Sequence, residues 1–340
     1  MSERRKIILH IGAGKTGSTA IQNFLSLNAD ALREEGIVIP DGDLNLTGKI
    51  HGNHVPAMQR LLAKPGSGRR ELEAAIRDIH EKTNGATILI SAENLVAQAA
   101  APSLFEGLAK DHDIEVILYI RRQDDFLLSG WQQWHAKVRD DFWAWLIAVV
   151  GSTADWRAYL IRWEKVIPRD KIKVRLFDRK KMEGGDVVSD FFSLLGLSAP
   201  FDSFVYPDTV INPSFADSIT ELVKGNKTIF RDAHDNRFQN FVHYLTGDRF
   251  VKDSKESKLT AAQRRAIVTR YAASNRWVQE NYFRDKAGDL FAPIKDSDYF
   301  YPDSKTMRRR QLEFVVTILF RYYRFALSRR KDSGIGKSPE

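Results

Sequence analysis

The chain opens with an apolar run that leads into a glycine-rich segment, and this junction constrains the fold more than any other feature. The run Ile7–Ile11 predicts a buried strand. Gly12, Gly14 and Gly17 let the backbone turn tightly after it. From Ala20 onward, apolar residues recur at helical spacing. A strand, a glycine loop and a helix N-terminus in succession predict an anion site, because backbone N–H groups and the helix dipole point into the loop.

The side chains of this loop favour a phosphate-like anion. Lys15 adds a full positive charge, and three residues add hydroxyl donors. The three are Thr16, Ser18 and Thr19. A nucleotide-triphosphate P-loop needs a glycine five positions before Gly14, where this chain has Leu9. The segment therefore departs from the triphosphate motif, and the alternative to an anion site is a solvated turn.

A second strand-like run, Glu115–Ile120, ends in an arginine and is followed by a helical pattern. Ser129 lies eight positions after that arginine, Arg121. A guanidinium offers forked donors to a phosphate, and a serine two helical turns later can contact the same phosphate from the helix. The alternative is that Arg121 pairs with Asp124 or Asp125.

Together these segments resemble the sulfotransferases that use 3′-phosphoadenosine 5′-phosphosulfate (PAPS). The order Lys15-Thr16-Gly17-Ser18-Thr19 is similar to the loop with which that family holds the 5′-phosphosulfate. Arg121 and Ser129 have the spacing of its 3′-phosphate clamp. A strand over 171–178 and a helix over 186–195, ended by Gly196, extend the resemblance to residues 7–197. The resemblance implies that PAPS is bound by Gly14, Lys15, Thr16, Gly17, Ser18, Thr19, Arg121 and Ser129.

The resemblance also implies how the reaction runs. Sulfuryl transfer is an in-line displacement at sulfur, so the protein positions the partners and stabilises charge. Lys15 would neutralise the bridging oxygen as its bond to sulfur breaks, and no metal is expected. The acceptor hydroxyl needs a base, for which we expect Glu93, just past an apolar run. Carbohydrate sulfotransferases commonly use a glutamate. His54 is the rival base, and Glu93 could instead cap a helix or pair with Arg121 or Arg122.

Strand-like runs near residues 6–11, 37–40, 86–91, 115–120 and 172–177 alternate with helical patterns. This alternation predicts a central parallel sheet flanked by helices, with ligands at the carboxyl ends of the strands. We therefore expect a three-layer, P-loop-like α/β fold. The expected organisation is one α/β domain over 1–303 and a basic helical extension over 304–340.

Composition limits the remaining possibilities. The chain has no cysteine, which excludes disulfides and thiol chemistry. The N-terminus is basic and followed by a largely apolar run of only five residues, which fits neither a secretory signal nor a membrane anchor. Because PAPS is made in the cytoplasm, we expect a cytoplasmic enzyme that resembles bacterial members of the family.

The charge is concentrated at the C-terminal end. Residues 304–340 carry ten basic and three acidic residues, and so contribute +7 of the formal net charge of +8. Apolar and aromatic residues lie between the basic ones, a mixture that suits an anionic membrane surface. The alternative is a helix docked on the body or on a second subunit. Nucleic acid is not expected as a partner, because the rest of the chain has no basic stripe.

The function expected from these observations is transfer of a sulfuryl group from PAPS to a hydroxyl of a carbohydrate or glycolipid, with adenosine 3′,5′-bisphosphate as the second product. Two alternatives remain open. One is a P-loop ATP-dependent kinase, which would need Mg²⁺ and the missing early glycine. The other is a non-catalytic nucleotide-binding relative. The sequence leaves the oligomeric state open.

Overall fold

The structure, a computed structural model, describes residues 4–64, 66–207, 215–250, 255–284 and 288–332, with side chains up to residue 329. Residues 333–340 of the predicted extension lie outside the described residues. Contacts along the chain divide it into two units. The first unit comprises Met1–Arg122, Asp155–Ile211 and Ala272–Phe291, and the second comprises Gln123–Ala154, Asn212–Tyr271 and Ala292–Glu340. The domain boundary between residues 303 and 304 remains a prediction.

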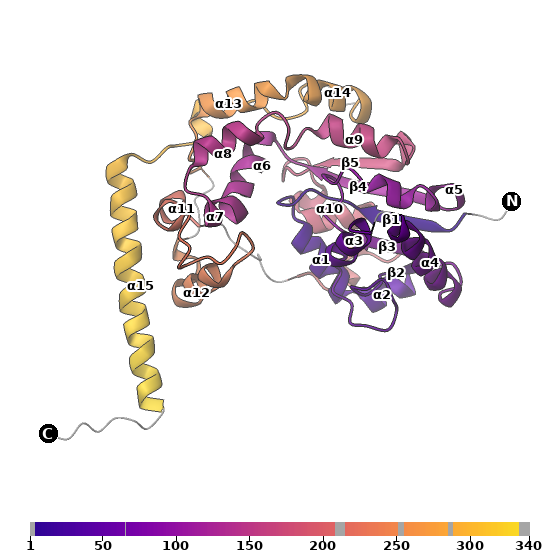
Figure 1. The fold of residues 1–340 in the computed structure, drawn as a ribbon, viewed down its shortest axis with the longest axis horizontal. Coiled ribbons are helices and arrows are strands. Elements are labelled where there is room, and N and C mark those ends of the chain that lie inside the picture. Colours follow the sequence, from indigo (N-terminus) through magenta and orange to yellow (C-terminus); the bar gives the residue numbers. More distant parts are fainter. Residues whose placement is uncertain (1–3, 65, 208–214, 251–254, 285–287, 333–340) are drawn as a thin grey trace. The chain divides into compact units, whose positions relative to one another are not determined.

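A parallel sheet lies at the centre of the first unit (Figure 1). Within the described residues its five strands follow the order β2-β3-β1-β4-β5. The strands are β1 (Lys6–His10), β2 (Ile37–Val38), β3 (Thr87–Ser91), β4 (Asp113–Ile120) and β5 (Ile172–Leu176). In register, His10 pairs with Ser91 on one side and with Ile117 on the other. The predicted α/β class and the parallel sheet are therefore confirmed.

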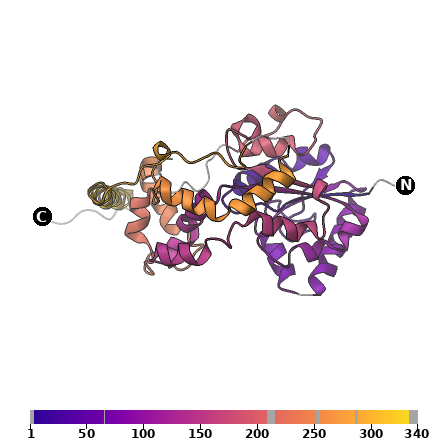
Figure 2. The ribbon, with the colours of Figure 1, turned by 90° about the horizontal axis from the view of Figure 1, so that it is seen from above.

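Helices cover both faces of this sheet. The alternate residues Ile7 and Ile8 of β1 point to opposite faces, yet both side chains are buried. On one face, α1 and α10 pack in one hydrophobic core with Ile8 and Tyr119. Figure 2 shows helical layers on either side of the strands of this unit. The helices of the first unit are α1 (Ser18–Leu27), α2 (Ala29–Glu34), α3 (Val55–Leu62), α4 (Ser67–Lys82), α5 (Leu108–Asp111), α9 (Trp156–Glu164), α10 (Val187–Ser193) and α14 (Ala272–Tyr282).

The strand order changes direction at β1. The chain continues from β1 to β2 and β3 on one side of it, and then to β4 and β5 on the other. In parallel α/β sheets, ligands bind outside the carboxyl ends of the strands at such a reversal. The glycine loop that follows β1 lies at this point.

The second unit is helical in its described part. Its segments are α6 (Gln123–Gly130), a π-helical turn (Trp131–His135), α7 (Ala136–Val138), α8 (Phe142–Val149), α11 (Asp217–Val223), α12 (Arg237–Thr246), α13 (Ala261–Arg270) and α15 (Ser304–Asp332). A buried arginine on α13 joins it to the first turn of α6. Arg264 donates hydrogen bonds to both Asp124 and Asp125, at 2.7 Å each. Its guanidinium also lies 3.7 Å from the ring centre of Tyr299. The predicted C-terminal helical extension is present as α15.

Candidate functional site

The loop after β1 is held in an unusual backbone conformation. Lys15 has a φ of 68°, in the left-handed region that side chains with a Cβ rarely adopt, and Gly17 has a φ of 83°. The hydroxyl of Thr16 donates to the carbonyl of Ala13 at 2.6 Å and closes the turn. Thr16 is therefore a buried structural residue of the loop, while Thr19 is exposed on α1.

The helix that follows the loop begins without a side-chain cap. Gly17 is the residue before α1, and no side chain caps this end of the helix in the described structure. The N–H groups of a first helical turn have no partner within the helix, so they need one from a side chain, water or ligand. Together with the positive end of the helix dipole and Lys15, they favour an anion at this point.

Gly17 is also where α1 packs against its neighbour. A Cβ at this position would lie 2.8 Å from a methyl group of Val187 and 3.1 Å from the ring of Phe177. We expect Gly17→Ala to lower the free energy of unfolding by about 2–4 kcal/mol, because left-handed strain and overpacking add. Gly36→Ala is the matched control, since Gly36 has a φ of 81° but a Cβ added there would meet nothing within 4 Å. It should cost about 1–2 kcal/mol in the same urea titration. If the two variants lost equal free energy of unfolding, packing at Gly17 would add nothing to the cost of the left-handed backbone.

Arg121 contacts the loop from the neighbouring strand. It follows β4, and its guanidinium donates to the carbonyl of Lys15 at 3.1 Å. The guanidinium also lies 5.6 Å from the ring centre of Phe177, a cation–π arrangement that holds it beside the loop. The structure thus brings Lys15 and Arg121 together at one edge of the sheet.

Ser129, the predicted partner of Arg121, lies on α6 in the second unit, where it is half-buried. The clamp formed by these two residues remains a prediction. The alternative is that Arg121 pairs with Asp124 or Asp125. Arg264 competes for these two carboxylates, because both accept hydrogen bonds from it.

Glu93 lies on the other side of β1. It follows β3, and the backbone N–H of Ala92 donates to the carbonyl of His10 at 2.8 Å, which continues the pairing beyond the strand end. The side-chain amide of Gln22, on α1, donates to a carboxylate oxygen of Glu93 at 2.5 Å. The carboxylate is half-buried and so retains access to solvent. Glu93 therefore lies at the same sheet edge as the loop, in contact with the helix that the loop begins.

Sequence reasoning missed the residues that support Glu93. Gln22 lies one helical turn after Ser18, so the face of α1 that starts in the loop was a signal that could have revealed it. The amide of Gln22 also donates to the hydroxyl of Ser91 at 3.5 Å, and the imidazole of His10 lies 2.8 Å from the same hydroxyl. Burial lowers the pKa of His10 to about 3, so this imidazole is neutral at physiological pH.

His54, the rival base, is fully buried. The backbone N–H of Ser91 donates to Nδ1 at 3.1 Å, and Nε2 lies 3.0 Å from the carbonyl of Pro40. This pattern corresponds to a neutral imidazole with its proton on Nε2 and its lone pair engaged. Burial further lowers the pKa of His54. These contacts favour Glu93 over His54 as a base.

A buried ion pair fixes α10 against the sheet beside the loop. Asp190 accepts hydrogen bonds from the hydroxyl of Tyr119 at 2.7 Å and from Nε of Arg175 at 2.9 Å. The Arg175 guanidinium, which lies against this carboxylate, helps to hold the pKa of Asp190 below its usual range. Because α10 carries Val187, this pair also positions the surface that Gly17 contacts.

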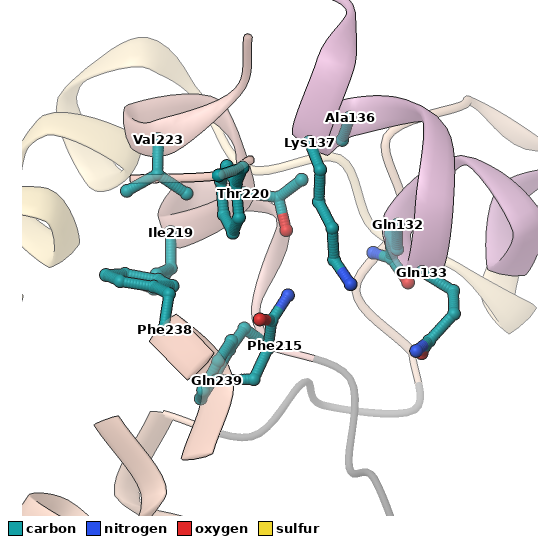
Figure 3. A pocket seen from close by; sticks show the side chains of 11 residues that line it. Gln132, Gln133, Ala136, Lys137, Phe215, Ile219, Thr220, Val223, Phe238 and Gln239 are labelled. Carbon is teal, nitrogen blue, oxygen red and sulfur yellow. The ribbon is translucent and has the colours of Figure 1, made fainter. Parts of the chain in front are cut away.

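A small pocket lies within the second unit (Figure 3). Ile219 and Phe238 contribute apolar wall, and Lys137 and Gln239 contribute polar groups. Its free volume is about 30 Å³, which is room for about two water molecules. Lys137 donates to the side chain of Asn236 at 2.7 Å.

Comparison with known proteins adds little to this geometry. No family model matches the chain. An uncharacterized protein from Archaeoglobus fulgidus is 24% identical over 202 residues, which are 59% of this chain and 54% of that protein. The chain thus spans about half the length of the curated relative it matches. A crystal structure of a sulfotransferase from Alicyclobacillus acidocaldarius matches with a TM-score of 0.32 and 14% identity, over 62% of this chain and 87% of that one. Similarity at this level does not establish a function, which depends on the residues of the site.

Proposed function

We propose that this protein is a sulfotransferase that transfers a sulfuryl group from PAPS to a hydroxyl of a saccharide or glycolipid. One observation carries the proposal: Lys15, Arg121 and Glu93 lie at the same edge of the sheet, on three adjacent strand ends. Lys15 and Arg121 are cations that suit a polyanionic donor, and Glu93 is a carboxylate that suits an acceptor hydroxyl. No metal ion takes part in the proposal.

The residues present fit such a donor. The uncapped first turn of α1 offers N–H groups, and Lys15 adds charge at the loop. Arg121 adds a planar guanidinium from β4, a geometry suited to phosphate oxygens. In the proposal the loop of Gly14 to Thr19 holds the 5′-phosphosulfate, and Arg121 with Ser129 holds the 3′-phosphate. PAPS itself supplies the activated sulfur.

Glu93 and Lys15 divide the chemical work. Glu93 accepts the proton of the acceptor hydroxyl as that oxygen bonds to sulfur. Lys15 stabilises the negative charge on the phosphate oxygen as its bond to sulfur breaks. Gln22 holds the carboxylate of Glu93 in place through its amide. A carboxylate base also supports the acceptor class, since the carbohydrate sulfotransferases that the sequence resembles use a glutamate.

Titration calorimetry with the full chain tests the donor. Adenosine 3′,5′-bisphosphate is expected to bind, and Arg121→Ala should weaken that binding by about tenfold or more, because one charge-assisted contact contributes about 1.5–3 kcal/mol. ATP with Mg²⁺ is the comparison ligand. Tighter binding of ATP with Mg²⁺ than of the bisphosphate would instead favour a kinase.

A further inference from the structure

The long helix α15 packs on the second unit through one of its faces. Phe314 is buried in a core with Phe215, Ile219, Val242 and Phe250. Further along the same face, the guanidinium of Arg321 donates to the carbonyl of Leu245, and the ring of Phe325 packs edge-on against Tyr244. Phe314, Arg321 and Phe325 are seven and four positions apart, so they occupy one side of α15.

The opposite side of α15 presents a row of large apolar side chains, which we call the outer stripe. Its residues, with the exposed fraction of each, are Leu312 (66%), Val316 (57%), Leu319 (63%), Phe320 (60%), Tyr323 (59%) and Leu327 (40%). Their spacing extends the stripe over about 23 Å of helix. Figure 1 shows α15, in yellow, as one continuous helix. A contiguous apolar surface of this kind marks an interaction site.

The charges around the outer stripe are positive. Lys305, Arg308 and Arg309 are exposed in the turns just before it and lie on the same side of the helix. From residue 304 to residue 329 the helix has a single acidic residue, Glu313. Glu313 is paired with Arg249 at 2.8 Å. The stripe is therefore bordered by cations without a matching group of acids.

We infer that the outer stripe is a docking surface for an anionic lipid membrane. Apolar side chains of an amphipathic helix enter the boundary between headgroups and acyl chains, and lysines and arginines contact the anionic headgroups. A second copy of the chain fits less well. Basic residues stand at both ends of α15, so parallel and antiparallel pairing both bring like charges together. Among the helices described here, none has both the length and the hydropathy to cross a bilayer.

Vesicle co-sedimentation of the full chain tests this inference, with phosphatidylcholine vesicles that contain or lack phosphatidylglycerol. Removal of residues 304–340 is unsuitable, because it would take Phe314 out of a core.

The combined variant Val316→Gln, Leu319→Gln and Tyr323→Gln should lower partitioning by about tenfold or more. The variant Arg308→Gln with Arg309→Gln should lower it about 30-fold on anionic vesicles only, since each cation contributes about fivefold.

Ile147→Gln is the matched control, because Ile147 is 73% exposed on α8, away from α15 in sequence. Its partitioning should equal that of the unaltered chain.

The inference would be overturned if the unaltered chain partitioned equally to both vesicle types, or if the triple variant lost no binding. A dimer in analytical ultracentrifugation that the triple variant abolishes, without vesicle binding, would assign the stripe to a second copy. The arginine variant leaves the apolar stripe intact, so it tests the charge contribution separately.

Discussion

Replacement of Lys15 by alanine is expected to lower kcat for sulfuryl transfer by about 10²–10³-fold. In the proposed reaction, Lys15 stabilises charge that develops as the sulfur–oxygen bond breaks, so its contribution is larger in the transition state than in the bound donor. Binding of adenosine 3′,5′-bisphosphate should also weaken, because its 5′-phosphate keeps the oxygen whose negative charge Lys15 would stabilise. Steady-state assays with PAPS and an acceptor panel, together with calorimetry, measure both quantities.

Lys82→Ala is a suitable control for this variant. Lys82 lies at the end of α4 in an exposed pair with Asp78, so its loss removes one positive charge without touching the loop. Its kcat should remain within about twofold of the unaltered protein. If Lys15→Ala kept full turnover and Gly17 variants did as well, the loop after β1 would have no role in catalysis.

Replacement of Glu93 by glutamine should lower kcat by about 10²–10⁴-fold, the usual contribution of a general base. Glutamine preserves the size of the side chain but cannot accept the acceptor's proton at neutral pH. Gln22→Ala should have a smaller effect, because it loosens the carboxylate without removing it. Steady-state kinetics with PAPS and an acceptor separate the two roles: Gln22→Ala should keep much of its kcat, and Glu93→Gln should lose nearly all of it.

Glu34→Gln, on the exposed surface of α2, controls for the loss of a carboxylate. It should leave turnover unchanged. If Glu93→Gln remained nearly as active as the unaltered protein while a folded His54→Ala variant was inactive, the base would be His54. The unaltered protein provides the test for a non-catalytic relative. If it bound the bisphosphate but turned over no acceptor, and Lys15→Ala and Glu93→Gln behaved in the same way, the chain would be such a relative.

The sheet can be predicted from the sequence because its signals are local. Each strand is a short apolar run bounded by turn residues, and every predicted run overlaps one of the strands, although β4 begins two residues before its run. The anion loop is visible for the same reason: Gly17, Lys15 and the start of α1 are neighbours in the chain. The helix predicted over 186–195 is shorter in the structure: α10 covers Val187–Ser193 with Leu194 as its C-cap, so Gly196, although its φ is 67°, lies beyond the C′ position.

Features that depend on tertiary packing cannot be predicted in this way. The contact between Gln22 and Glu93 joins side chains 71 residues apart, and no local pattern specifies it. His54 is the rival base, but only the folded structure shows that its imidazole is buried and that both ring nitrogens contact the backbone. The pairing of Arg264 with Asp124 likewise spans 140 residues.

The interleaving of the two units has a practical consequence. The chain passes from one unit to the other after residues 122, 154, 211, 271 and 291, so each unit is assembled from three separate stretches of sequence. Neither unit can be obtained by expressing one contiguous fragment, and a cut at any single peptide bond leaves at least one of them incomplete. Ribosomal synthesis must therefore deliver residues beyond 291 before the helical unit has all its parts, so this unit cannot be completed before most of the first unit has been synthesised.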